Sequence, residues 1–148
     1  MSLVKFYKPN SASTGSAASF QSKENKGQLE VYLNMVKQSS WDISTKTGSF
    51  KSDDPSSKIA VKFNAMELAA IAKAIMEKGK FSTVHVYGKD KTSISFAPYT
   101  KKDGVTISFG LSVTKNSNKF SISFEQHEAY ALKLFCDHSI QQIFAFEK

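Results

Sequence analysis

The sequence predicts an α+β fold in which two antiparallel β-meanders are each followed by an α-helix. Apolar and polar residues alternate with a period of two over several short stretches, a pattern typical of half-buried strands. Two longer stretches have a helical period instead. The turns between the strand-like stretches are short, which disfavours a parallel sheet because parallel strands need long crossovers.

The first meander and its helix are expected within residues 27–79. The alternating stretches run from Leu29 to Met35, from Trp41 to Thr45 and from Ile59 to Phe63. The helix should begin after Asn64, because Asn is a favoured N-cap and Glu67 three residues later completes a capping box. Gly79 is expected to end this helix.

The second meander follows directly and contains four alternating stretches. They are Val84–Tyr87, Ser93–Ala97, Val105–Val113 and Phe120–Phe124. Turn residues separate them, at Gly88, Gly104 and Asn116. A final helix is expected from about Glu125, and its apolar face would contain Ala129, Leu132, Phe135 or Cys136, Ile140 and Ile143.

An internal repeat supports the two-part architecture. Residues 58–67 resemble residues 119–128, since in both a strand ends in Phe and Glu follows at the third helical position. A repeat of this kind would fix the order as sheet, helix, sheet, helix. Chance, or the chemistry common to many helix starts, would explain the same short match.

The first residues differ in composition from the rest of the chain. Ser11 to Ser19 is a run of small residues, typical of a flexible segment. We therefore expect residues 1–26 to form an N-terminal arm and residues 27–148 to form the domain. If the arm is ordered, Phe6, Tyr7 and Phe20 are its expected anchors, either on its own domain or on a neighbouring subunit.

Charge is strongly unbalanced toward lysine. The 148 residues include 20 basic and 13 acidic side chains, a net charge of +7, and every basic residue is Lys. This excess favours a polyanionic partner such as nucleic acid. The absence of Arg disfavours bidentate readout of guanine and leaves sequence-independent attraction to phosphates. A coding bias toward Lys would also explain the absence of Arg.

Residue types that carry catalysis or hold metals show no useful spacing. Cys136 is the only cysteine, which excludes a disulfide within the chain and favours a reducing, intracellular setting. His85, His127 and His138 lack the spacing of a zinc site. There is neither an apolar run long enough to span a membrane nor a secretory signal. We therefore expect a non-enzymatic protein with no cofactor, metal, membrane or small-molecule substrate.

Single-strand binding needs positive charge along the phosphates and flat side chains that stack on bases. Most Phe residues fall on apolar faces and are expected in the core. Tyr, Trp and Lys on polar strand positions and turns are better candidates. The expected nucleic-acid-binding residues are Lys26, Tyr32, Trp41, Lys46, Lys58, Lys62, Tyr87, Lys89, Lys91, Tyr99 and Lys101. The alternative for each is an amphipathic residue at a sheet edge or a solvated Lys that protects an edge from aggregation.

Three stretches resemble the whirly family, which is related in fold to the positive cofactor four coactivators and to mitochondrial guide-RNA-binding proteins. Lys26-Gly27-Gln28-Leu29 resembles the start of the family's first strand. The order sheet, helix, sheet, helix covers residues 27–146. The segment from Phe124 to Leu132, with the terminal residues 143–146, resembles the closing helix. Leu29-Glu30-Val31 replaces the longer Lys-Gly-Lys motif of plant members, so the plants' higher-order assembly is not carried over.

The resemblance implies single-stranded DNA binding with little sequence specificity, serving replication, recombination or transcription. It also implies a homo-oligomer, a dimer or tetramer, held together by the helices. A compact chain without organelle targeting resembles phage or bacterial relatives, in the cytoplasm or nucleoid of a bacterial or phage-infected cell. The alternatives are an RNA-binding protein of the same fold and a structural or assembly protein, such as a virion or scaffold component.

Overall fold

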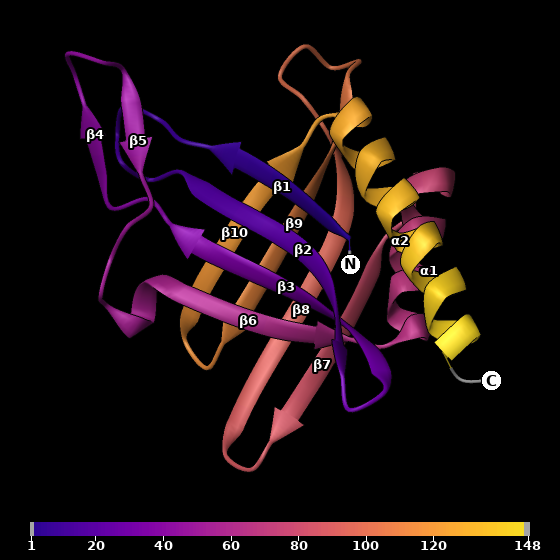
Figure 1. The fold of residues 1–148 in the computed structure, drawn as a ribbon. Coiled ribbons are helices and arrows are strands. Elements are labelled where there is room, and N and C mark those ends of the chain that lie inside the picture. Colours follow the sequence, from indigo (N-terminus) through magenta and orange to yellow (C-terminus); the bar gives the residue numbers. More distant parts are fainter. Residues whose placement is uncertain (1, 147–148) are drawn as a thin grey trace.

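Two four-stranded antiparallel sheets, a small hairpin and two helices make up residues 2–146, the part of the chain that the computed structural model describes (Figure 1). The first sheet has the strand order β1-β2-β3-β6 and the second has the order β10-β9-β8-β7. This arrangement confirms the α+β class with two meanders, each followed by a helix.

The elements follow one another in two similar halves. The first half contains β1 (Leu3–Lys8), β2 (Ser16–Asn25), β3 (Gln28–Lys37), the hairpin strands β4 (Ser40–Asp42) and β5 (Thr47–Ser49), β6 (Lys58–Phe63) and α1 (Ala65–Glu77). The second half contains β7 (Phe81–Tyr87), β8 (Asp90–Thr100), β9 (Ile107–Lys115), β10 (Asn118–Phe124) and α2 (Gln126–Phe146). A single 3-10 turn, Pro55–Ser57, precedes β6.

The start of α1 follows the local sequence closely. The Asn64 side chain accepts a hydrogen bond from the Glu67 backbone, and the Glu67 carboxylate accepts one from the Asn64 backbone, which completes the expected capping box. The end of the helix differs from expectation. Lys78, rather than Gly79, takes the left-handed conformation, with φ 54° and ψ 40°, and the Gly79 N–H donates to the Ala74 carbonyl.

The expected N-terminal arm is instead half of the first sheet. Residues 3–8 and 16–25 form β1 and β2, and β2 pairs with β3 along its whole length. The small residues alternate between faces like any strand residues, with Ala18 buried and Ser19 on the opposite face. Phe6 and Phe20 are buried as expected, whereas Tyr7 is 62% exposed. A run of small side chains is typical of flexible segments. Composition does not show, however, that this run pairs with β1 and β3.

The expected strand from Trp41 to Thr45 is only partly present, because β4 covers Ser40–Asp42 and residues 43–45 lie in a turn. Asp42 ends β4, because its carboxylate accepts hydrogen bonds from the backbone and hydroxyl of Ser44 and from the Thr45 backbone. This local bonding turns the chain. Ile43 therefore lies in the turn, 83% exposed, and the β4–β5 hairpin projects away from both sheets (Figure 1).

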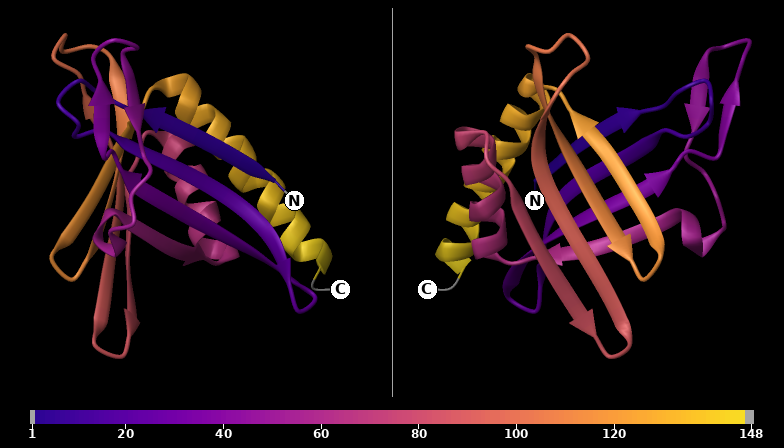
Figure 2. Two further views of the ribbon diagram at one scale, coloured as in Figure 1. Left: turned by 60° about the vertical axis from the view of Figure 1, so that its left-hand side comes forward. Right: turned by 180° about the vertical axis from the view of Figure 1, so that it is seen from behind.

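The two sheets cross with their apolar faces toward one another, and both helices lie together on one side of them (Figure 2). Phe124 of β10 is fully buried and packs edge-to-face on Phe6 of β1, with ring centroids 4.7 Å apart. The ring centroid of Phe135 in α2 lies 6.2 Å from that of Phe20 in β2. The core is thus shared between both sheets and the helices, and the opposite sheet faces remain open to solvent.

Candidate nucleic-acid interface

The solvent face of the first sheet is set by its register. Two rows cross the four strands: Leu3, Gln21, Tyr32 and Lys62 form one, and Tyr7, Ala17, Val36 and Lys58 form the other. Between them lies the row Lys5, Ser19, Asn34 and Ala60. Alternation along β6 places Ile59, Val61 and Phe63 in the core, so Lys58 and Lys62 point outward as expected.

A groove runs along the free edge of β6. The β7–β8 hairpin extends beyond β6 at the lower end of Figure 1, and a cavity of about 710 Å³ lies between them. A second cavity of about 500 Å³ continues from it toward the start of β6, and both are lined by Ala60 and Lys115. We call this continuous surface the β6 groove. Its principal residues are Lys58, Ala60, Lys62, Tyr87, Thr92, Lys115, Asn116 and Asn118.

The two ends of the β6 groove differ in charge. At the α1 end, His85 Nε2 lies 2.6 Å from Glu67 Oε2. Where the two cavities meet, Lys115 Nζ lies 3.8 Å from Asp90 Oδ2. The other cavity is lined by Lys58, Asn116 and Asn118 as well as Lys115, and no described lining residue of that cavity is acidic. An anion is therefore attracted most strongly to the end at which β6 begins.

One ion pair fixes the lysine in the middle of the β6 groove. Lys62 pairs with Glu30, a nearly buried carboxylate that also accepts hydrogen bonds from Asn25 and Tyr32. The Lys62 ammonium, followed by the Asn25 amide, lowers the pKa of Glu30, and the same pairing raises the pKa of Lys62. Lys62 thus stays charged and keeps a fixed position, although Glu30 neutralises part of its field.

The aromatic candidates differ in how open their rings are. Tyr87, at the end of β7, is 80% exposed and lines the β6 groove, so its ring is available for stacking. Tyr32 is half-buried, and the Lys23 ammonium lies 4.6 Å from the centre of its ring. Burial, followed by the Glu30 charge, raises the pKa of Tyr32. Stacking on Tyr32 would require that Lys23 moves aside.

The structure brings some of the expected residues together and separates others. Tyr87, Lys58 and Lys62 line the β6 groove, and Lys89 and Lys91 lie exposed at the adjoining β7–β8 turn. Trp41 and Lys46 lie on the projecting β4–β5 hairpin, and Lys26 lies in the exposed β2–β3 turn. Tyr99, near the end of β8, and Lys101, directly after that strand, lie opposite to the end of β8 that meets the groove.

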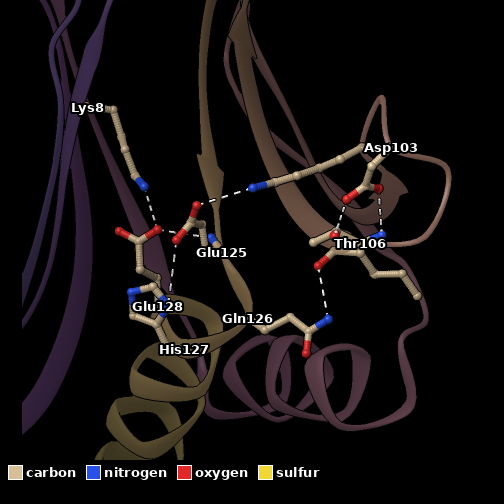
Figure 3. Close-up of polar contacts among 9 residues, drawn as sticks. Lys8, Asp103, Thr106, Glu125, Gln126, His127 and Glu128 are labelled. Atoms are coloured by element: carbon tan, nitrogen blue, oxygen red, sulfur yellow. Dashed lines mark hydrogen bonds and ion pairs between the residues drawn. The ribbon is translucent and has the colours of Figure 1, made fainter.

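Polar contacts hold the loop between β8 and β9 (Figure 3). Lys101 Nζ donates to Glu125 Oε1 at 3.2 Å, and Asp103 accepts from the Thr106 hydroxyl and from two backbone N–H groups. Glu128 pairs with Lys8 of β1 and caps the Glu125 backbone. Lys101 is therefore half-buried and paired, which makes it a weaker phosphate ligand than the free lysines.

Glu125, His127 and Glu128 place ligand atoms within 4.8 Å of one another (Figure 3). Each carboxylate already has a cationic partner, since Lys101 contacts Glu125 and Lys8 contacts Glu128. Their positions at the start of α2 are also explained by capping and by the helix dipole. The arrangement is that of a helix N-terminus with ion pairs rather than of a metal centre.

The Asp103 contacts give a pH prediction. The Thr106 hydroxyl, followed by the Val105 and Thr106 backbone N–H groups, lowers the pKa of Asp103 from 3.8 to about 2. A lowered folded-state pKa contributes stability above the unfolded value, and that contribution is lost as the pH falls toward 2. We expect Asp103→Asn to lower the melting temperature at neutral pH, and the difference from the parent chain to shrink below pH 3.8.

Thermal unfolding followed by circular dichroism across the acidic range tests this expectation. Asp53→Asn, at an exposed loop residue, is the control for loss of one surface carboxylate. A difference between the parent and Asp103→Asn that stays constant down to the lowest pH would contradict the role given to this carboxylate.

Several residues of the β6 groove were missed from the sequence. Lys115 ends β9, Asn116 lies in the β9–β10 turn and Asn118 begins β10, a segment that local patterns identify only as a turn. Asn118 accepts from Lys37 Nζ at 2.6 Å and donates to the Ser56 carbonyl at 2.7 Å, so it holds Lys37 beside the groove. No local signal identifies these residues, because they meet β6 only through the crossing of the sheets.

Cys136 lies in the core. Its side chain is fully buried in α2, and burial raises the pKa of its thiol to about 12. A thiol in this state is a poor nucleophile at neutral pH.

In the described residues, 2–146, neither helix is long and apolar enough to cross a membrane.

Comparison with solved structures identifies the fold. The chain superposes on WHY3 from Arabidopsis thaliana with a TM-score of 0.63 at 11% identity, covering 99% of this chain and 90% of that one. It superposes on the plant transcriptional regulator PBF-2 with a TM-score of 0.60 at 12% identity, covering 99% of this chain and 84% of that one. This chain has a whirly-like fold.

A third similar structure comes from a trypanosome. MRP1/MRP2 of Trypanosoma brucei superposes with a TM-score of 0.60 at 15% identity, covering 99% of this chain and 97% of that one. No protein-family model and no curated protein matches the sequence. The likeness to whirly proteins thus lies in the three-dimensional arrangement, and it includes β1 and β2, because the superpositions span nearly the whole chain.

Proposed function

We propose that this whirly-like protein binds single-stranded DNA in the β6 groove with little sequence specificity. The observation that carries the proposal is the groove itself, in which Lys58 and Lys62 of the edge strand β6 and Lys115 of β9 line the same hollow as the exposed ring of Tyr87. Lysines attract phosphates regardless of sequence, and an open tyrosine ring stacks on any base. No reacting group is needed, so the proposal is of a binding protein and not an enzyme.

The whirly-like fold supports this assignment. PBF-2, one of the similar structures, is described as a plant transcriptional regulator. By analogy we place the present chain in DNA metabolism, in transcription, replication or recombination. This extension rests on fold analogy, whereas the binding itself rests on the groove.

The helices support a homo-oligomer. Large apolar side chains are exposed on them, namely Met66, Met76, Tyr130, Leu134 and Phe144. Such exposure on adjacent helices marks a surface suited to association. We propose that copies of the chain associate through α1 and α2, which leaves the β6 groove open. Mass measurement in solution, with and without DNA, tests this point.

Salt dependence tests the proposed binding. For single strands, the logarithm of affinity falls with the logarithm of salt concentration by about 0.7 per phosphate neutralised. The lysines at positions 58, 62 and 115, of which Lys62 and Lys115 have carboxylate partners, therefore predict a slope no steeper than about −2. Lys58→Gln should make the slope less steep by about 0.7. The matched control is Lys73→Gln, at an exposed position of α1.

The titration compares single-stranded DNA, RNA and duplex DNA by fluorescence anisotropy. Preferential binding of single-stranded DNA with the expected slope supports the proposal. Preferential binding of RNA would show that the groove is an RNA-binding site instead. Absence of binding to single strands at low salt would leave a structural or assembly role and overturn the proposal.

A further inference from the structure

A second hollow on the solvent face of the first sheet lies outside the β6 groove. It has a volume of about 310 Å³, and its floor contains the small residues Ala17 and Ser19 of β2. The chain after β5 returns across this face and places Phe50 and Lys51 at the rim. Lys5 and Tyr7 of β1 and Asn34 and Val36 of β3 also line it. We call this the Phe50 pocket.

The lining of the Phe50 pocket has the composition of a nucleotide site. The rings of Tyr7 and Phe50 lie 5.7 Å apart in an edge-to-face arrangement, and Tyr7 is 62% exposed because it points away from the core. Lys5 and Lys51 are exposed, and none of the described residues that line the pocket is acidic. Two rings and two unopposed ammonium groups match a base and its phosphates.

The Phe50 pocket and the β6 groove are joined across the sheet. Tyr7, Ala17, Val36 and Lys58 form one row through β1, β2, β3 and β6. Three strand spacings of about 4.8 Å separate the two ends of that row, roughly 14 Å in all. Lys58 is the residue at which the groove begins. The positive end of the groove thus faces the pocket, and no described acidic side chain lies in the row between them.

We propose that the Phe50 pocket is a second subsite for the same single strand, holding a base against Tyr7 and Phe50 with its phosphates at Lys5 and Lys51. This inference rests on the proposed function of the β6 groove and extends it. A single strand that leaves the groove at Lys58 crosses Val36 and Ala17, and enters the pocket. Longer oligonucleotides therefore gain contacts that short ones lack.

Oligonucleotide length separates the two sites experimentally. Wild-type protein is titrated with thymidine oligonucleotides of about 4 and about 12 nucleotides, within the site sizes of single-strand-binding proteins. Phe50→Leu keeps an apolar side chain but removes the ring. We expect it to weaken binding of the longer oligonucleotide by about 5- to 100-fold and to leave the shorter one unchanged.

A second variant, which removes only charge, tests the subsite without the risk that the protein fails to fold. Lys5→Gln with Lys51→Gln changes only exposed side chains, so it should not alter the melting temperature. It should make the salt slope of the longer oligonucleotide less steep by about 1.4, twice the single-phosphate value. Lys73→Gln with Lys80→Gln removes the same charge away from both sites and should leave the slope unchanged.

The outcomes separate the two proposals. If wild-type protein binds neither oligonucleotide, the function proposed for the β6 groove fails. If wild-type protein binds both, and the Phe50 and lysine variants bind the longer one as wild type does, the groove stands and the second subsite is overturned. Equal losses for both lengths would also overturn it, because the pocket would then not be reached through the groove.

Discussion

A chain that lacks residues 1–26 is expected not to fold. The deletion removes β1 and β2, two of the four strands of the first sheet. Phe6 and Phe20 leave the core with them, and each deleted Phe side chain costs about 3–5 kcal/mol. These two losses alone approach the whole stability of a typical domain, about 5–15 kcal/mol. The β3 strand would also become a free edge of the sheet, and its core residues Val31, Leu33 and Met35 would lose their neighbours on β2.

Circular dichroism, thermal unfolding and size-exclusion chromatography measure the outcome. The matched control shortens the turn at the tip of the β4–β5 hairpin, replacing residues 43–46 with Asn-Gly, and should fold normally because that turn is exposed. A truncated chain that unfolds cooperatively near the wild-type melting temperature would show that the first 26 residues are an accessory arm after all.

Removing two lysines and the exposed ring of the β6 groove should nearly abolish single-strand binding. The variant combines Tyr87→Ala, Lys58→Gln and Lys115→Gln. Loss of one stacked base costs about 1–3 kcal/mol, and loss of two phosphate contacts lowers affinity further at moderate salt. We expect a decrease in affinity of about 10²- to 10³-fold at about 0.1 M salt.

Folding should survive these three changes, because Tyr87 is 80% exposed and both lysines are at the surface. Melting temperature checks this for each variant. Lys73→Gln with Lys80→Gln is the charge-matched control on and beside α1. Trp41→Ala and Tyr99→Ala test the candidates that lie outside the groove and should weaken binding far less. A triple variant with wild-type affinity would exclude the groove as the binding site.

The sequence determines the elements whose causes are local. The alternation in β3, β6 and β10 depends on neighbouring residues, and these strands lie where that pattern predicts. The α1 start depends on Asn64 and Glu67, which bond within one turn. The apolar face of α2 is likewise set by helical spacing, and Ala129, Leu132 and Cys136 are fully buried on it.

The misread segments are those in which local chemistry is ambiguous. A run of Ser and Ala between residues 16 and 19 suits both a flexible linker and a strand, and pairing with β1 and β3 decides between them. Residues 41–45 alternate like a strand, but Asp42 turns the chain by bonding to Ser44 and Thr45. The competition between side-chain and backbone hydrogen bonds is not visible in a hydrophobic pattern.

The candidate site shows the same division. The sequence by itself selected Lys58, Lys62 and Tyr87 as outward-facing residues of the right chemistry, because strand alternation fixes the face of a side chain. Only the tertiary structure decided that they share a groove with Lys115 and that Trp41, Lys46, Tyr99 and Lys101 lie elsewhere. The groove arises from the crossing of two sheets, and the angle of that crossing depends on packing between residues far apart in the chain, such as Phe6 and Phe124.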